Sequence, residues 1–139
     1  MIVEEIMSRK VITIKSDGTL YKAQSLMVKN SIRHLPVVEK KELQGIITES
    51  DIRGAFVQNN ENSSRITILD PKMMKVADFM TQDPQTVQPN TNIEDAALLV
   101  YKNKIGSLPV IDDGKLVGII SILDMLGLFI ELMGIIHSS

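Results

Sequence analysis

Apolar residues recur along this chain in two patterns, short strand-like runs and longer stretches with helical spacing. The strand-like runs form two pairs, 35–38 with 43–47 and 108–111 with 116–120. Within 20–27 and 93–100, apolar residues lie three or four apart, which predicts one buried face on each of two helices. Thr19 and Asn92 precede these helices and are suited to cap them. Asp113-Gly114 predicts a tight turn between the second pair of strands.

The two halves of this pattern are copies of one another. When the sequence is shifted by 73 residues, positions 3–56 align with 76–129 without a gap. Identical residues recur throughout the alignment and are densest at 35–37 and 45–47. A repeat of this length is the signature of one structural unit used twice.

Each copy predicts the order strand, helix, strand, strand, helix, with short first strands at 11–14 and 86–87. One unit of about 55 residues is only marginally stable by itself. The predicted fold class is therefore α+β, with two β-α-β-β-α repeats that bury their sheets against each other. The expected domains are 1–57 and 76–136, joined by a polar connection at 58–75 that Ile66, Ile68 and Leu69 would partly anchor.

Composition and charge exclude several classes of function. The 139 residues include 15 basic and 17 acidic side chains, so the chain lacks the positive field that attracts nucleic acid. With no cysteine and two histidines, disulfides, thiolate chemistry and a multi-histidine metal site are not expected. The N-terminus does not resemble a signal peptide, and Asp124 and Glu131 interrupt the apolar stretch 119–136, which disfavours a membrane span. A cytoplasmic location is expected.

The sequence contains no motif typical of an enzyme. It has no glycine-rich phosphate loop after a strand and no serine nucleophile elbow. Asp51 and Asp124 belong to separate repeats, so they do not form an acid–base pair in one cleft. The eight methionines fall mostly at apolar positions and are interpreted as core residues. We therefore expect a protein that is not an enzyme.

The repeated motif resembles the cystathionine-β-synthase (CBS) domain. Residues 80–124 contain Met-Thr-x-x-Pro-x-Thr-Val, and later Leu-Pro-Val-Ile-Asp-x-Gly-x-Leu-Val-Gly-Ile-Ile-Ser-x-x-Asp, and residues 7–51 contain a second copy. The opening Met-Ile-Val-Glu and the run Ile-Arg-His-Leu-Pro-Val-Val are similar to the CBS half of acetoin-utilisation regulatory proteins. The resemblance implies a tandem pair, or Bateman module. Such a module binds adenosine-containing ligands in clefts between repeats, signals to a partner and commonly dimerises.

Thr48 and Asp51, and Ser121 and Asp124, stand where a strand enters a helix, and the resemblance makes Asp51 and Asp124 candidate ribose ligands. Free N–H groups at such a helix start favour anionic oxygens, and Thr48 could donate to a phosphate or ribose oxygen. The alternative is a capping box, since Ser/Thr-x-x-Asp is close to that motif. The two interpretations are compatible.

Arg33 and His34 precede the first Leu-Pro-Val run, where an arginine can bind phosphate oxygens and a histidine can donate another hydrogen bond. The second repeat has Gly106 and Ser107 there, which predicts one stronger phosphate site and one weak or empty site. The alternative is that Arg33 and His34 are simply the polar residues before a strand. Arg53 is interpreted as a solvated helix residue.

An adenine ring would need an apolar slot. Candidate lining residues, for which ordinary core packing is the alternative, are Val11, Ile12, Pro36 and Val37 in the first repeat and Pro84, Gln85, Pro109 and Val110 in the second.

The final helix, predicted from about Ile122 to Ile136, is apolar on nearly all sides and needs a second cover. We therefore expect a homodimer through helices of both repeats, or a missing domain. The leading function is a regulatory sensor of AMP, ADP or ATP that acts on an effector protein, with S-adenosylmethionine or NADH as second choices. The alternative is a structural dimerisation module without a nucleotide site.

Overall fold

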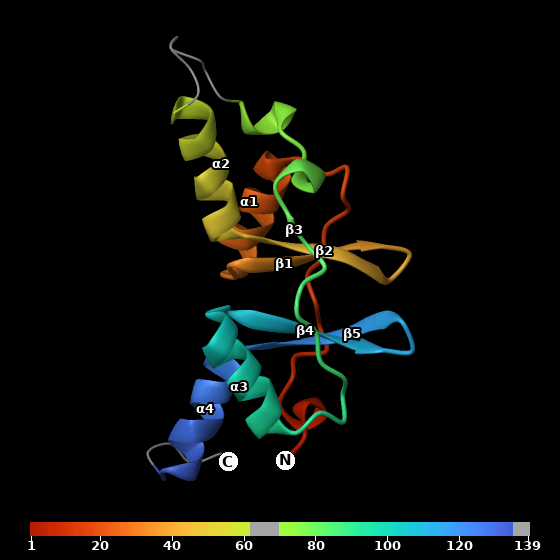
Figure 1. Cartoon of the computed structure of the whole chain (residues 1–139), viewed down its shortest axis with the longest axis vertical. Helices are drawn as coiled ribbons and strands as arrows, with labels where there is room; N and C mark the ends of the chain where they lie inside the picture. The colour runs from red at the N-terminus through yellow and green to blue at the C-terminus, as the bar shows by residue number, and fades with distance from the viewer. Residues whose placement is uncertain (62–69, 135–139) are drawn as a thin grey trace. The chain divides into compact units, whose positions relative to one another are not determined.

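The structure is a computed structural model that describes residues 1–61 and 70–134 (Figure 1). The expectations for Ile66, Ile68, Leu69 and the end of the final helix fall outside these ranges. Along the chain the elements are η1 (Val3–Glu5), α1 (Leu20–Asn30), β1 (His34–Glu39), β2 (Glu42–Thr48), α2 (Glu49–Glu61), η2 (Pro71–Met73), η3 (Val76–Asp78), β3 (Thr81–Gln82), α3 (Ile93–Asn103), β4 (Ser107–Asp112), β5 (Lys115–Ser121) and α4 (Ile122–Leu132).

The mixed helix and strand class and the two repeats are confirmed. Each repeat has a helix, an antiparallel hairpin and a second helix, with β1 paired to β2 and β4 paired to β5. The predicted first strands are reduced to single parallel bridges, Ile14 with Val37 and Val87 with Val110. The segment predicted as a polar connection begins inside α2, because that helix continues to Glu61.

Both hairpins turn in the same way. Asp113 and Gly114 have φ of 51° and 76°, the left-handed pair that a two-residue turn between strands requires. Lys40 and Lys41 adopt the same conformation, with φ of 50° and 69°, although neither is glycine. Because Glu39 pairs with Glu42, the turn consists of two residues, Lys40 and Lys41. Strand pairing therefore holds both lysines in the left-handed conformation, which side chains other than glycine rarely adopt.

The two compact units of the chain do not follow the order of the repeats. The central unit contains Ile12–Pro84, and the terminal unit combines Met1–Val11 with Gln85–Ser139. Each repeat therefore contributes its first segment to the other unit. Val3 packs in the core of the terminal unit, and its copy Val76 packs in the core of the central unit; both are fully buried.

Main-chain hydrogen bonds fix these exchanged segments. In the terminal unit, Val3 N donates to Thr91 O at 2.8 Å, and Ser8 exchanges two bonds with Ile119. In the central unit, Val76 N donates to Gly18 O at 2.8 Å, and β3 extends the β1–β2 hairpin by pairing with β2. Each unit is thus completed by the first segment of the other repeat. That segment lies about 73 residues in sequence from the equivalent segment of the unit's own repeat.

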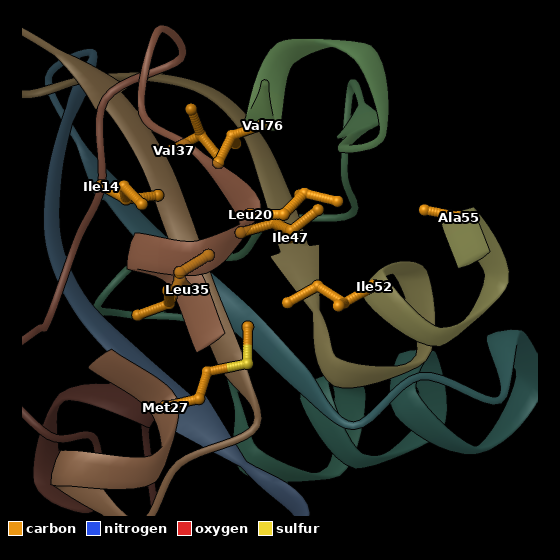
Figure 2. Close-up of a cluster of buried hydrophobic side chains, with 10 residues drawn as sticks. Ile14, Leu20, Met27, Leu35, Val37, Ile47, Ile52, Ala55 and Val76 are labelled. Atoms are coloured by element: carbon orange, nitrogen blue, oxygen red, sulfur yellow. The ribbon is translucent and has the colours of Figure 1, made fainter. Parts of the chain in front are cut away.

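The core of the central unit lies between its hairpin and its two helices (Figure 2). It contains Leu20 and Met27 from α1, Leu35 and Val37 from β1 and Ile47 from β2. Fully burying such a side chain stabilises the fold by about 1.5–3 kcal/mol. Of the predicted caps, Thr19 accepts a bond from Lys22 N at 3.1 Å, whereas Asn92 makes no side-chain cap bond.

Within the described ranges, the helices are too short or too polar to cross a membrane.

Candidate functional site

The junction of β2 and α2 holds Thr48 and Asp51 in a reciprocal cap. Thr48 N donates to Asp51 Oδ2 at 3.0 Å, and Asp51 N donates to Thr48 Oγ1 at 3.1 Å. Ser121 and Asp124 repeat the arrangement at 2.8 and 3.2 Å between β5 and α4. The capping interpretation is therefore confirmed for both pairs. Within the described residues each carboxylate accepts one hydrogen bond, from the main-chain N–H of Thr48 or Ser121, so oxygen lone pairs remain for a ligand.

Arg33 and His34 lie beside this cap because β1 begins where β2 ends. His34 pairs with Thr48 across the hairpin, and Glu49 N donates to Arg33 O at 3.0 Å. The exposed Arg33 side chain forms an ion pair with Glu49, with 3.5 Å between Nε and Oε2. The first repeat therefore gathers a cation, an imidazole, a hydroxyl and two carboxylates at the N-terminus of α2.

The half-buried imidazole of His34 is held neutral by its surroundings. Burial lowers its pKa below the usual 6.5, the charge of Arg33 lowers it further, and the carboxylate of Asp51 acts in the opposite direction. A neutral imidazole offers one donor and one acceptor, so near neutral pH it does not add charge to the site.

The lowered pKa gives a testable pH dependence. The unfolded chain binds the His34 proton more tightly, so this group's contribution to stability is fully present above pH about 6.5 and is lost as the pH falls through the lowered pKa. We expect His34→Gln to reduce the loss of unfolding free energy between pH about 7.5 and about 5, as measured by urea denaturation. An unchanged pH dependence would contradict this prediction.

The second repeat lacks the charged groups but contains a feature that sequence reasoning did not single out. Ser107, the counterpart of His34, is 5% exposed, and its Oγ has no hydrogen-bond partner among the described residues. A buried hydroxyl without a partner costs about 1–3 kcal/mol, so a ligand that bonded to it would recover that energy. The hairpin register places Ser107 opposite Ser121 at the start of β4, and nothing in the sequence indicated that its hydroxyl would lack a partner.

Grooves beside the two aspartates differ in charge. Asp51 lines a groove of about 600 Å³ together with residues that include Arg53, Asp78 and Phe79. The groove at Asp124, about 560 Å³, is lined by the acidic side chains of Glu5 and Glu131 and by no lysine or arginine. The groove of the central unit is therefore better matched to an anionic ligand than its copy.

Four of the eight candidate adenine-slot residues are buried, namely Pro36, Val37, Pro109 and Val110. Val37 belongs to the core of the central unit, as Figure 2 shows, and Pro36 and Pro109 are fully buried. Ile12 is half-buried and packs against the same core. Both prolines occupy the third position of their strands, one residue further from the strand start than in the predicted runs 35–38 and 108–111.

In residues 1–61 and 70–134, no cluster of three or more histidine, aspartate or glutamate side chains could hold a metal ion.

The fold and the repeated cap agree with one protein family. The model of the CBS domain matches residues 3–58 and 76–131, so this chain belongs to the CBS-domain family and contains a tandem pair.

Solved structures of this family are similar over nearly the whole chain. A crystal structure described as an acetoin utilization protein from Vibrio cholerae is 30% identical, with a TM-score of 0.84, covering 97% of this chain and 96% of its own. A CBS domain pair in complex with 5′-methylthioadenosine and S-adenosyl-L-methionine is 30% identical, with a TM-score of 0.80 and coverage of 93% and 95%. CBSX2 in complex with AMP is 28% identical, with a TM-score of 0.78 and coverage of 95% and 98%.

Proposed function

We propose that this chain is a cytoplasmic, non-catalytic regulatory module that binds AMP, ADP or ATP and transmits binding to an effector protein. The observation that carries the proposal is the convergence of Arg33, His34, Thr48 and Asp51 at the start of α2. The two similar CBS pairs crystallised with AMP and with S-adenosylmethionine support a ligand that contains adenosine.

Each side chain has a separate role in this proposal. The Asp51 carboxylate accepts hydrogen bonds from the ribose hydroxyls with the lone pairs that its cap leaves available. Arg33 binds phosphate oxygens, and Thr48 and His34 donate to phosphate or ribose oxygens. Ser121 and Asp124 form a second, weaker site without a cation. Ile12, which is half-buried, supplies an apolar wall near the adenine, whereas Pro36, Val37 and Pro109 are fully buried and pack within their own units.

Signalling requires that the ligand distinguish between two states of the module. A ligand shifts an equilibrium only by as much as its affinities for the two states differ. S-Adenosylmethionine and NADH remain the second choices, because they share the adenosine that Asp51 would bind.

The proposal is tested by isothermal titration with AMP, ADP, ATP and S-adenosylmethionine. Removing a charge-assisted ribose contact in Asp51→Ala should weaken binding by about 10- to 100-fold. Because Asp51 also caps α2, Asp124→Ala is the matched control: it removes the equivalent cap of α4 and should leave the stronger site intact. Asp51→Asn, which keeps a capping oxygen but lacks the charge, should also bind more weakly.

Three outcomes would overturn the assignment. Equal binding by the wild type and Asp51→Ala would move the site away from the central unit. Loss of binding only in Asp124→Ala would assign the stronger site to the terminal unit. Absence of heat with every ligand, at several temperatures and in folded protein, would favour the structural dimerisation module.

A second proposal concerns self-association, and the outer face of α4 supports it. Apolar side chains on this helix are strongly exposed, among them Leu123 (76%), Phe129 (57%) and Leu132 (74%). Between α3 and α4 lies an apolar groove of about 960 Å³ whose lining includes Tyr101 and Leu126. We propose a homodimer through helices of both repeats with α4 as its main contact, since the described exposed apolar residues of α1 and α2 are fewer.

A further inference from the structure

The ion pair between Arg33 and Glu49 places a carboxylate on the side chain proposed to bind phosphate. Glu49 is the first residue of α2, and its backbone N–H also donates to Arg33 O at 3.0 Å. The contact is one of two ion pairs among the described residues, and the other joins Arg9 and Glu4. The equivalent positions in the second repeat are Gly106 and Ile122, so the pair occurs only at the proposed phosphate site.

The charges around this pair nearly cancel. Arg33 is balanced by Glu49, and Asp51 adds a second carboxylate two residues further along α2. The cation on the groove side is Arg53, which is exposed and lines the same groove as Asp78. The site therefore has three carboxylates, those of Glu49, Asp51 and Asp78, against the two guanidinium groups of Arg33 and Arg53. Such a site does not suit a ligand with three or four negative charges.

We infer that Glu49 competes with ligand phosphate for Arg33 and thereby sets the ligand's charge preference, favouring adenosine compounds of low negative charge over the triphosphate. This inference rests on the proposed function, since it assumes that Arg33 faces the phosphate. The side chains of Arg33 and Glu49 are 80% and 49% exposed, and exposed pairs of this kind are weak. A phosphate can consequently displace Glu49 from Arg33. The ion pair therefore tunes the affinity for the ligand but does not block the site.

The test compares wild type and Glu49→Gln by titration with adenosine, AMP and ATP in magnesium-free buffer. Glutamine should strengthen AMP binding by about two- to fivefold, since it removes a weak competing ion pair. The gain for ATP should be larger, and adenosine should bind both proteins equally. Glu94→Gln is the matched control, because Glu94 is also exposed in the first turn of a helix but forms no ion pair within the described residues.

A double-mutant cycle with Arg33→Ala separates competition from simple repulsion. If Glu49 acts by occupying Arg33, Glu49→Gln should have little effect on AMP binding when Arg33 is absent. An equal gain in both backgrounds would show repulsion alone and overturn the inference. Nucleotide binding that is the same in wild type and Glu49→Gln would overturn it while leaving the proposed function in place. Failure of every ligand to bind either protein would overturn both.

Discussion

Gly45→Ala is expected to destabilise the protein by about 1–3 kcal/mol, because a Cβ at this position has no room. It would lie 2.6 Å from Thr81 O and 2.9 Å from Met80 Sδ. The sulfur can move, but Thr81 O belongs to the backbone of β3, which pairs with β2 at this point. Alanine should therefore push the exchanged segment, including η3 and its buried Val76, away from the hairpin.

Urea denaturation of matched glycine variants checks this result. At Gly118 a Cβ would lie 2.6 Å from Met7 Sδ and 3.0 Å from Ser8 O, so Gly118→Ala should destabilise the terminal unit in the same way. Gly54, within α2, has no atom within 4 Å of the added Cβ, and Gly54→Ala should stabilise the helix by about 0.5–1 kcal/mol. A Gly45→Ala protein as stable as Gly54→Ala would contradict the prediction.

Phe129→Glu combined with Leu132→Glu is expected to convert a dimer into a monomer, if α4 forms the main contact between copies. Both side chains are exposed in the single chain, so their substitution should leave the core intact. Losing two apolar anchors and burying two charges should raise the dimer dissociation constant by about 100-fold or more. Analytical ultracentrifugation over a range of concentrations measures the change from twice the 15.5 kDa chain mass to the mass of one chain.

The matched control for this pair of substitutions is Met73→Glu. Met73 is 81% exposed on η2, outside the helices of the repeats, so the same change from an apolar to a charged side chain should leave the dimer unaffected. A wild-type protein that stays monomeric at high concentration would contradict the proposal. A double variant that still forms dimers would place the contact on another surface.

Local features of the fold were predictable from the sequence because short-range physical chemistry decides them. The spacing of Leu20, Ala23 and Met27 predicts the buried face of α1, and the Asp113-Gly114 turn follows from backbone sterics. The Thr48–Asp51 and Ser121–Asp124 caps follow from their spacing across one helical turn. Arg33 and His34 were recognised as candidate phosphate ligands, but their place beside the first cap follows from the β1–β2 register, which pairs His34 with Thr48.

The exchange of segments, the Arg33–Glu49 pair and the unpartnered hydroxyl of Ser107 were decided only by the tertiary structure. Val3 and Val76 are equivalent residues of two copies with the same apolar pattern, so this pattern fits either core equally well. Only the path of the chain in three dimensions selects the core in which each is buried. Hydrophobic periodicity specifies which side chains must be buried, whereas the partner of each depends on contacts between segments far apart in sequence.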